Sequence, residues 1–326
     1  MIMAHAIRFH KTGGPEVLQL EEVSVGEPGP GQIRVRNAAV GLNYIDTYHR
    51  SGLYPVPLPS GIGLEGAGTV TAVGPDVTEF KVGDRVGYGS GPLGAYSTER
   101  VTAADRCVLL PEGLSEETAA AIMLKGMTSR YLLRRTYKVQ AGDTILVHAA
   151  AGGVGLIMCQ WAKHLGATVI GTVGSDEKAA LAKAHGCDHP IVYTREKFVD
   201  RVKEITGGKG VPVVYDSVGK DTFMGSLDCL QPLGTMVTFG NASGPVTGLD
   251  TGILAAKGSL YLTRPTLMTY TAKRSDLVET ANDLFEVVLK GAVKIEIAQR
   301  YALKDAATAH RDLEGRKTTG STLLMP

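Results

Sequence analysis

The sequence has few cysteines and no spacing that would join them into a framework. Four cysteines stand in 326 residues, namely Cys107, Cys159, Cys187 and Cys229, and no Cys-x2-Cys pair occurs. Scattered thiols of this kind are typical of a reducing compartment and argue against a disulfide scaffold. The short cluster His185-x-Cys187-x-His189 lies in a predicted helix-to-strand turn. Such turns often collect these residue types, so we expect no metal there.

The chain also lacks an excess of charge of either sign. Its 34 basic and 33 acidic side chains nearly cancel. Electrostatics therefore gives no reason to expect nucleic acid or an anionic membrane as a partner. Residues 1–8 have neither the basic region nor the long apolar segment of a signal peptide. We expect a cytoplasmic protein with a small neutral ligand.

One uncharged stretch approaches the length of a membrane span. Residues 144–162 carry no formal charge, and a bilayer span needs ~20 apolar residues. However, His148 and Gln160 interrupt the run, and its glycines cluster as a turn. We therefore expect no membrane span.

The same stretch has the pattern of a strand, a glycine turn and a helix. Residues 145–147 form an apolar run, Ala150-x-Gly152-x-x-Gly155 supplies the turn, and apolar residues then recur at helical spacing. This order aims backbone N–H groups and a helix N-terminus at a pyrophosphate. Gly152 would let the phosphate approach the backbone, and Gly155 would let helix and strand pack closely. Because Ala150 replaces the first glycine of the usual fingerprint, a buried βα unit that binds nothing is the alternative.

The order of the predicted elements indicates two domains of different class. From Met3 to about Leu110, short strands alternate with glycine and proline turns, which predicts a largely antiparallel β domain. From residue 142 to 239, strands alternate with helices, which predicts an α/β doubly wound parallel sheet of Rossmann type. The last stretch returns to the first domain. We predict a catalytic domain over 1–124 and 292–326 and a nucleotide-binding domain over 125–291.

Four further elements are predicted outside this alternation. Ser115 has the features of an N-cap before an acidic first turn, and a second helix is predicted from Met127 to Arg135. Residues 43–50 form one early helix. Ser259–Thr263 is an apolar strand predicted at the sheet edge. Because an uncovered edge pairs readily with its two-fold mate, we expect a homodimer through this strand.

The residues after the second Rossmann strand favour NADPH over NADH. NAD-binding units place a carboxylate ~20 residues beyond the glycine turn, where it accepts from the ribose 2′-OH. Residues 168–174 contain no carboxylate, and Ser175 and Lys178 offer a donor and a cation for a 2′-phosphate. The alternative is that Ser175 only caps its helix and that Lys178 is solvated, with Asp176 and Glu177 adding negative charge nearby.

Motifs along nearly the whole chain resemble those of one family. They are Gly13-Gly-Pro-Glu-Val-Leu18, Asn43-Tyr-Ile-Asp-Thr-Tyr48, Ser51-Gly-Leu-Tyr54, the glycine turn within 142–163, Val214-Tyr-Asp-Ser-Val-Gly219, Phe239-Gly-Asn241 and Thr263-Arg-Pro265. With these motifs the chain resembles the NADPH:quinone oxidoreductases, the zeta-crystallin-like branch of the medium-chain dehydrogenase/reductase superfamily. The resemblance implies a GroES-like catalytic domain beside the Rossmann domain.

The resemblance also bears on zinc. Zinc-containing relatives carry a Gly-His-Glu whose histidine binds the catalytic metal, whereas this chain has Gly63-Leu64-Glu65. Leucine is not a metal ligand. We therefore expect no metal and an acceptor that needs little Lewis-acid help, such as a quinone or a conjugated enone.

The site residues follow from the resemblance, position by position. The pyrophosphate of NADPH would lie on Gly152, Gly153, Val154 and Gly155. The 2′-phosphate region would contact Ser175, Lys178 and Tyr193. The cofactor would be lined by Ser217, Phe239, Gly240, Asn241, Thr263, Arg264 and Pro265, with Arg316 reaching in from the last stretch. Asn43 and Tyr48 would border the nicotinamide, Thr128 would face it from the other side, and Tyr54 would join Asn43 and Tyr48 at the substrate.

Simpler roles exist for several of these residues. Asn43 has the features of a helix cap, and the three tyrosines at 48, 54 and 193 are candidates for ordinary packing. Asp216 is expected to serve as a backbone acceptor.

The implied reaction is hydride transfer from NADPH to a quinone in the cleft between the domains. Asn43 and Tyr48 are the expected hydrogen-bond donors to the quinone oxygen as charge develops on it. One alternative keeps the scaffold and changes the acceptor to an enone or alkenal. A second alternative is an NADPH-regulated structural or RNA-binding protein, which the balanced charge disfavours.

Overall fold

A computed structural model describes residues 1–326, and the chain divides into two compact units. The first unit comprises residues 1–127, 271–289 and 295–326, and the second comprises 128–270 and 290–294. The predicted nucleotide-binding domain, 125–291, includes the segment 271–289, which the structure groups with the first unit.

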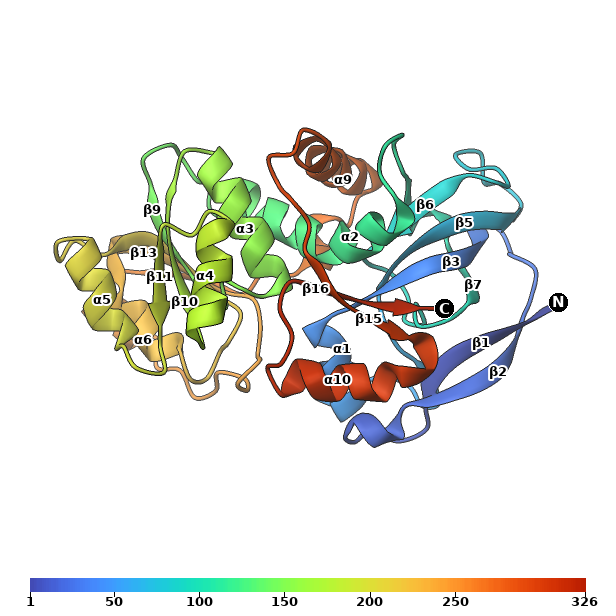
Figure 1. The fold of residues 1–326 in the computed structure, drawn as a ribbon, viewed down its shortest axis with the longest axis horizontal. Helices are drawn as coiled ribbons and strands as arrows, with labels where there is room; N and C mark the ends of the chain where they lie inside the picture. The colour runs from blue at the N-terminus through green and yellow to red at the C-terminus, as the bar shows by residue number, and fades with distance from the viewer. The chain divides into compact units, whose positions relative to one another are not determined.

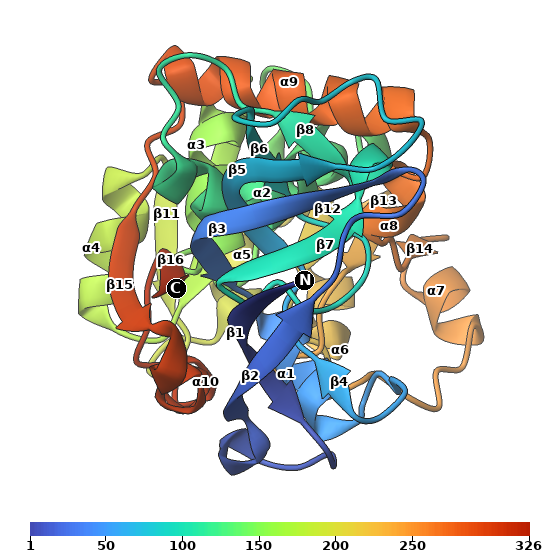
Figure 2. The same ribbon diagram turned by 90° about the vertical axis from the view of Figure 1, so that its right-hand side faces the viewer.

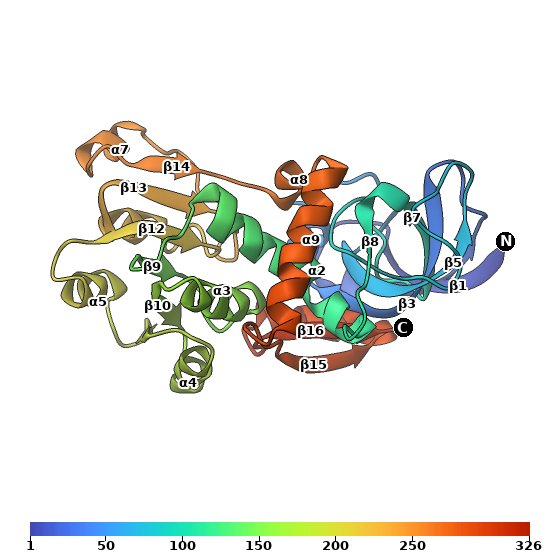
Figure 3. The same ribbon diagram turned by 90° about the horizontal axis from the view of Figure 1, so that it is seen from above.

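The second unit contains one six-stranded sheet. Its elements in chain order are β9 (Thr144–Val147), α3 (Gly153–His164), β10 (Thr168–Val173), α4 (Asp176–Ala184), β11 (His189–Val192), α5 (Phe198–Ile205), β12 (Val211–Asp216), α6 (Phe223–Asp228), β13 (Leu230–Thr238), α7 (Gly252–Ala256), β14 (Tyr261–Thr263) and α8 (Leu267–Tyr270). The strands follow the order β11-β10-β9-β12-β13-β14, and all neighbours are parallel. α3 contacts α4, and α5 contacts α6. The two pairs lie on opposite sides of the sheet in Figure 1, and Figure 3 shows α3 and α5 on opposite sides of β9 and β10. The predicted doubly wound Rossmann sheet is therefore confirmed.

Burial on both faces explains why these strands are nearly continuous apolar runs. Leu146, Ile170, Val214 and Met236 are each completely buried, one from each of the four inner strands. Parallel strands covered by helices on both faces have this composition. Because the strand order reverses between β9 and β12, their carboxyl ends form the switch point where such sheets bind ligands.

The first unit is mostly antiparallel β structure. Its elements in chain order are β1 (Ile2–Phe9), η1 (Pro15–Val17), β2 (Gln19–Val25), β3 (Gln32–Leu42), α1 (Tyr44–Ser51), β4 (Ser60–Gly61), β5 (Glu65–Val73), β6 (Arg85–Tyr88), β7 (Glu99–Ala103), η2 (Ala104–Arg106), β8 (Cys107–Leu109), α2 (Glu116–Tyr131), α9 (Arg274–Leu289), β15 (Ile297–Ala302), η4 (Leu303–Asp305), α10 (Ala306–Glu314) and β16 (Ser321–Met325). The strands form a three-stranded sheet, β2-β1-β4, and a seven-stranded sheet, β15-β16-β3-β5-β6-β8 with β7 paired to β3. The predicted β class of this region is confirmed.

The long strand β3 organises the larger sheet. It pairs antiparallel with β5, β7 and β16, and β5 and β7 flank it in Figure 2. Val40 lies opposite Leu324, so the end of the chain is hydrogen-bonded into the N-terminal sheet. Alternate residues of β3, such as Ile33 and Val35, are completely buried in the core of this unit.

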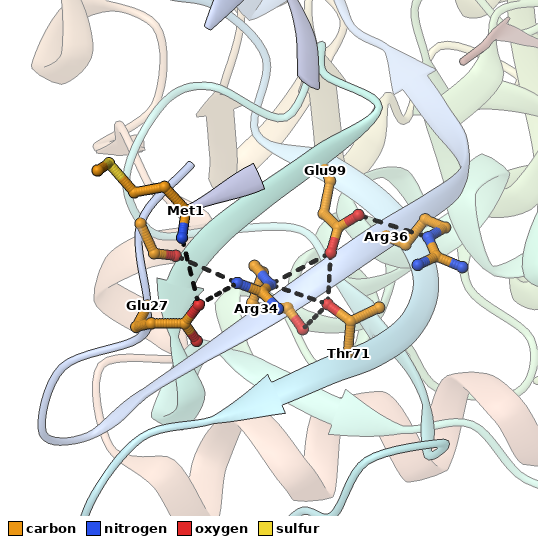
Figure 4. A network of polar contacts seen from close by, with 7 residues as sticks. Met1, Glu27, Arg34, Arg36, Thr71 and Glu99 are labelled. Carbon is orange, nitrogen blue, oxygen red and sulfur yellow. Dashed lines mark hydrogen bonds and ion pairs between the residues drawn. The ribbon is translucent and has the colours of Figure 1, made fainter. Parts of the chain in front are cut away.

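A polar network ties three strands of this sheet together on its other side (Figure 4). The Thr71 hydroxyl donates to Glu99 Oε1 at 2.5 Å, and Arg34 Nε lies 3.3 Å from the same oxygen. Arg36 Nε lies 3.4 Å from Glu99 Oε2, while Arg34 Nη1 contacts Glu27 at 3.1 Å. Glu99 and Arg34 are largely buried, so these contacts fix the register of β3, β5 and β7.

The predicted second helix from Met127 to Arg135 is wrong as a separate element. α2 runs without a break to Tyr131, and a single π-helical turn follows over Leu132–Thr136. Inside the helix, a Cβ on Gly126 would lie 2.4 Å from Leu284 of α9. Close packing against α9 therefore supports a glycine that would otherwise weaken the helix.

Candidate functional site

The turn between β9 and α3 follows the tight path that its glycines predict. Ala149 adopts a left-handed φ of 54°, and Gly152 is the N-cap of α3. A Cβ on Gly155 would lie 2.3 Å from the Ala149 carbonyl oxygen, so only glycine fits where helix and strand meet. A Cβ on Gly152 would meet the same oxygen at 3.2 Å, which is a tight but less severe contact.

The N-terminus of α3 is suited to hold an anion. The N–H groups of Gly153, Val154 and Gly155 occupy the first three helical positions, where an α-helix supplies no carbonyl partner. Residues 152–154 are partly exposed. The helix dipole adds positive potential at this end. These donors and the absence of side chains at 152 and 153 fit a pyrophosphate.

Ser175, Lys178 and Tyr193 come together where β10 and β11 end. The Ser175 hydroxyl caps α4 by accepting a hydrogen bond from the Lys178 backbone N–H at 3.3 Å. The Tyr193 hydroxyl lies beside Gly174, because a Cβ on that glycine would be 2.9 Å from it. The capping role of Ser175 is therefore present. It leaves the N-terminus of α4 as a second place for negative charge.

Sequence reasoning missed a cation at this end of the sheet. Arg195 forms a bidentate pair with Asp176, with N–O distances of 2.7 and 2.6 Å. The hydrogen bond from Arg195 lowers the pKa of Asp176. This guanidinium offsets the negative charge that Asp176 brings next to Ser175. Arg195 stands 19 residues after Asp176 and follows another strand, so the sequence gives little sign of the pairing.

Three loops meet at the carboxyl ends of β12, β13 and β14. A Cβ on Gly240 would lie 2.3 Å from the Ser217 carbonyl oxygen, so the loop after β13 packs directly on the loop after β12. The Arg264 guanidinium donates to the Thr238 carbonyl at 3.2 Å and ties the segment after β14 to β13. The structure thus brings together the predicted residues Ser217, Phe239, Gly240, Asn241, Thr263, Arg264 and Pro265.

Asp216 holds the loop that carries Ser217. Its Oδ1 accepts from the N–H groups of Val218 and Gly219 at 2.8 and 3.0 Å, and its Oδ2 accepts from the Thr222 hydroxyl at 2.7 Å. The side chain is completely buried. The predicted role as a backbone acceptor is confirmed.

Asn43, Tyr48 and Tyr54 lie around α1 in the first unit. The Tyr48 ring is almost completely buried and packs edge-on against Tyr54, with ring centres 5.2 Å apart. Asn43 is the N-cap of α1 and forms a capping box with Asp46. The Asp46 carboxylate accepts from the Asn43 backbone N–H at 2.9 Å, and the Asp46 N–H donates to the Asn43 backbone carbonyl at 3.0 Å. The predicted capping features of Asn43 are therefore present.

The capping contacts of Asn43 do not use the hydrogens of its side-chain amide. One of these hydrogens is donated to a buried ion pair. Asn43 Nδ2 donates to Glu65 Oε2 at 2.7 Å and points its other hydrogen to the Gly41 carbonyl at 3.4 Å. Lys125 Nζ lies 2.7 Å from the same Glu65 oxygen, and the two charged side chains are 6% and 0% exposed. Sequence reasoning missed Glu65 and Lys125, which are 60 residues apart.

A chain of buried hydrogen bonds joins α1 to α10. Arg50 Nη1 lies 3.0 Å from His310 Nδ1, and the Tyr96 hydroxyl lies 3.2 Å from His310 Nε2. Because a guanidinium only donates, Nδ1 accepts and the ring proton of His310 sits on Nε2. The Tyr96 hydroxyl extends the chain of hydrogen bonds by donating to Asp46 Oδ2 at 2.7 Å. Arg50 also forms a bidentate pair with Glu314 at 2.8 and 2.9 Å.

Burial shifts the pKa values of Asp46 and His310, two members of this chain, toward their neutral forms. It raises the pKa of Asp46 to about 7 and lowers the pKa of His310 to about 3. The Arg50 guanidinium lowers the pKa of His310 further, while the Tyr96 hydrogen bond partly opposes the shift in the pKa of Asp46.

Arg316 follows this chain, and Thr128 lies on α2. Arg316 has a left-handed φ of 59° just beyond α10. Burial raises the pKa of Tyr44, Glu314 raises it further, and Arg316 lowers it. The Tyr44 and Tyr48 rings are 5.7 Å apart, so the charge of Arg316 acts on a residue that packs against Tyr48. Thr128 stands one helical turn after Lys125 and is 6% exposed.

The position that holds zinc in metal-containing relatives is apolar here. Leu64 is 2% exposed and packed in the first unit. No group of three or more His, Cys, Asp or Glu side chains has metal-binding geometry. In the predicted His185-Cys187-His189 turn, His185 Nδ1 contacts the Leu181 carbonyl at 2.8 Å and Cys187 is buried.

Comparisons with known proteins agree with this two-part fold. Residues 29–139 match the model of the alcohol dehydrogenase GroES-like domain, and residues 153–286 match that of the zinc-binding dehydrogenases. The quinone oxidoreductase of Pseudomonas aeruginosa is 59% identical over 99% of this chain and 100% of its own length. The 2-haloacrylate reductase of Burkholderia sp. is 49% identical over 100% and 99%, respectively.

A solved structure extends the likeness to three dimensions. The crystal structure of Escherichia coli quinone oxidoreductase complexed with NADPH has a TM-score of 0.98 and 55% identity, with 99% of this chain and 100% of that chain covered. A GroES-like domain joined to a Rossmann domain defines the medium-chain dehydrogenases/reductases. Within that superfamily, this chain belongs to the quinone oxidoreductases.

Proposed function

We propose that the protein catalyses NADPH-dependent reduction of quinones without zinc. The observation that carries the proposal is the glycine turn at the switch point of the Rossmann sheet. It occurs in a chain that is similar over 99% of its length to a quinone oxidoreductase crystallised with NADPH. The buried Leu64, at the position of the zinc-binding histidine, supports a reaction without metal.

The residues of the second unit would hold NADPH at both of its phosphate regions. The N–H groups of residues 153–155 would bind the pyrophosphate, with Gly152 leaving room for its approach. Ser175, Lys178 and Tyr193 would contact the 2′-phosphate. The loops at Ser217, Phe239–Asn241 and Thr263–Pro265 would line the rest of the cofactor. Arg316, Asn43, Tyr48 and Thr128 would complete the site, and its location in a cleft between domains stays a prediction.

When bound, NADPH supplies the hydride, and the protein supplies position and hydrogen bonds. Tyr48 would offer its hydroxyl to the quinone oxygen as charge develops there, a contribution on the order of a few kcal/mol. Tyr54 packs against Tyr48 and would limit the tilt of a flat substrate. Asn43 has both amide hydrogens directed at protein acceptors, which disfavours it as a second donor to the quinone.

Stopped-flow oxidation of NADPH and NADH against a panel of quinones tests the activity. We expect rapid single-turnover oxidation of NADPH with 1,4-benzoquinone and no change when a zinc chelator is present. Failure to oxidise NADPH with any quinone, or loss of turnover on chelation, contradicts the proposal.

The 2′-phosphate assignment has its own test in Lys178→Ala. Removal of a charge-assisted contact of about 1.5–3 kcal/mol should weaken NADPH binding roughly 10- to 100-fold and leave NADH binding nearly unchanged. Fluorescence titration with the two cofactors measures both constants. An equal loss for NADPH and NADH would assign Lys178 a structural role.

An enone or alkenal reductase is the second candidate. It is favoured by the 49% identity to a 2-haloacrylate reductase, whose named substrate is a conjugated alkene. Turnover of 1,4-benzoquinone and of an alkenal, measured side by side with NADPH, separates the two candidates. Faster reduction of the alkenal would reverse our ranking.

We also propose a homodimer formed through β14. This strand lies at the free edge of the six-stranded sheet, and its Tyr261 is 62% exposed. Edge strands of this kind pair with a two-fold mate. None of the helices combines the length and the apolar character that a membrane span requires. Light scattering of a dilute sample should give twice the chain mass, and a cytoplasmic location stays a prediction.

A further inference from the structure

The carboxylate of Glu65 is surrounded by hydrogen-bond donors. Oε1 accepts from the Leu124 backbone N–H at 2.7 Å, and Oε2 accepts from Asn43 Nδ2 and Lys125 Nζ, each at 2.7 Å. The side chain is completely buried. A Cβ on Gly41 would lie 2.1 Å from Oε2 and 2.4 Å from the Ala120 carbonyl oxygen, so only glycine at position 41 leaves room for the carboxylate.

This arrangement fixes which way the Asn43 amide faces. A flipped amide would place its Oδ1 against the Glu65 carboxylate, where two acceptors would repel each other in a buried site. It would also move Nδ2 away from both Glu65 and Gly41. Asn43 therefore turns its N–H2 group toward Glu65 and its carbonyl oxygen away from it.

The Asn43 Oδ1 atom keeps the capacity to accept a hydrogen bond from a ligand. In the capping box it faces the Asp46 N–H, but that N–H donates to the Asn43 backbone carbonyl at 3.0 Å. An amide oxygen has two lone pairs, so a second donor can approach it. The direction of this acceptor is set by Glu65, a charge that is not itself part of the predicted site.

We propose that Glu65 is a positioning residue that makes Asn43 a hydrogen-bond acceptor for the nicotinamide riboside half of the cofactor. The inference rests on the proposed function and deepens it. The riboside offers two kinds of donor, the carboxamide N–H2 and the ribose hydroxyls. Asn43 Oδ1 accepts from one of them, and Glu65 keeps that oxygen in place.

Lys125 has a separate part in the arrangement. Its ammonium lies 2.7 Å from the Glu65 carboxylate and supplies the counter-charge that a buried carboxylate needs. A neutral acid would offer an O–H donor to Asn43 and lose the strong preference for one amide orientation. The ion pair therefore holds the orientation of Asn43, while Asn43 makes the contact.

The test measures cofactor binding in the absence of a quinone, so it does not depend on turnover. In Asn43→Ala, we expect the Kd for NADPH from fluorescence titration to rise about tenfold, the loss of one hydrogen bond to a ligand. Glu65→Gln should give a smaller rise of the same sign. Its amide oxygen would stay between Asn43 Nδ2 and Lys125 Nζ and accept from both, but a neutral oxygen holds the Asn43 amide less firmly than a carboxylate does. The double variant should bind no more weakly than Asn43→Ala. Additive losses would overturn the coupling.

A cofactor analogue separates the two donors. The reduced 3-acetylpyridine analogue of NADPH lacks the carboxamide N–H2 group. If the carboxamide is the partner, Asn43→Ala should weaken the analogue less than twofold. If a ribose hydroxyl is the partner, the analogue should lose the same tenfold as NADPH. Unchanged NADPH binding in Asn43→Ala, with a raised KM for the quinone alone, would overturn the proposal and assign Asn43 to the substrate.

A charge-exchange variant tests whether the loss of NADPH affinity comes only from a disturbed structure. In Asn43→Asp combined with Glu65→Gln, the introduced amide can donate to one oxygen of the introduced carboxylate and leave the other oxygen as an acceptor. We expect NADPH affinity within about threefold of the unsubstituted protein, by the same hydrogen-bond reasoning. Thermal melting of every variant accompanies the titrations. Restored folding without restored affinity would contradict the positioning role.

Discussion

The two units contribute different kinds of group to the proposed site. In the second unit, the phosphate-binding part is backbone, formed by one contiguous turn from Ala149 to Gly155. In the first unit, the corresponding part is made of side chains, with Asn43, Glu65 and Lys125 drawn from separate segments into one buried cluster. A backbone site tolerates the loss of most side chains around it. A buried cluster of charges depends on every member.

The largest effect should come from breaking the buried cluster. Lys125→Met leaves the Glu65 carboxylate buried without its counter-charge, and we expect the free energy of unfolding to fall by about 3–5 kcal/mol. Urea denaturation at neutral pH measures the change. Adding Glu65→Gln to the same chain should recover much of the loss, since it removes the uncompensated charge. A loss below about 1 kcal/mol in the single variant would mean that the pair is solvated.

Asp46 and His310, in the buried chain that starts at Arg50, should make the free energy of unfolding depend on pH in opposite directions. Between the unfolded pKa of Asp46, 3.8, and its folded pKa of about 7, the folded state binds the extra proton, so stability falls as pH rises. His310 is the reverse. Between its folded pKa of about 3 and its ordinary pKa of 6.5, the unfolded state binds the extra proton, so stability rises with pH.

Single variants should separate the pH dependence of stability that is due to Asp46 from the one that is due to His310. In His310→Gln, the Asp46 contribution should remain, and the free energy of unfolding should fall by up to about 4 kcal/mol from about pH 4 to about pH 7. In Asp46→Asn, stability should rise from about pH 3 to about pH 6.5, the window between the two pKa values of His310. Urea denaturation across this range tests both. Identical pH profiles for the two variants would contradict the assignment.

The glycine turn should show a smaller effect on stability. Gly155→Ala forces a Cβ against the Ala149 carbonyl, and we expect a loss of about 1–3 kcal/mol. Gly152→Ala meets the same oxygen at a longer distance and is the matched control. It should cost less stability and weaken NADPH binding instead. The comparison fails if the two variants lose equal stability and retain equal affinity for NADPH.

The smallest effect should come from the exposed pair between Arg195 and Asp176. Both side chains are more than half exposed, so Arg195→Met should leave the free energy of unfolding almost unchanged. Added salt should reduce even this difference. A change as large as that expected for Lys125→Met would remove the contrast between buried and exposed pairs.

The fold of the second unit was largely predictable from the sequence. Its strands are buried on both faces and its helices on one, so the apolar patterns and the glycines marked each element. The main error lay in the first unit, at the predicted helix boundary at Met127. A glycine inside α2 weakens the local signal, and the packing of Leu284 that compensates for it comes from a distant part of the chain.

The side-chain cluster of the first unit was not predictable in the same way. Asn43 was identified through a family resemblance, but the direction of its amide depends on Glu65, and Glu65 depends on Lys125. Arg195 and the chain through His310 were missed for the same reason. Each contact joins residues that belong to different elements. The residues next to each of them in the sequence form no pattern that identifies the partner.

The sequence by itself determined the strand–turn–helix path around Gly152 and Gly155, because backbone conformation and close packing depend on neighbours along the chain. It also determined the two fold classes through the periods of their apolar residues. Only the tertiary structure decided which atoms of Asn43, His310 and Asp46 donate and which accept. The physical reason is that a buried polar group takes its orientation and its proton from the partner placed beside it, and folding alone brings that partner near.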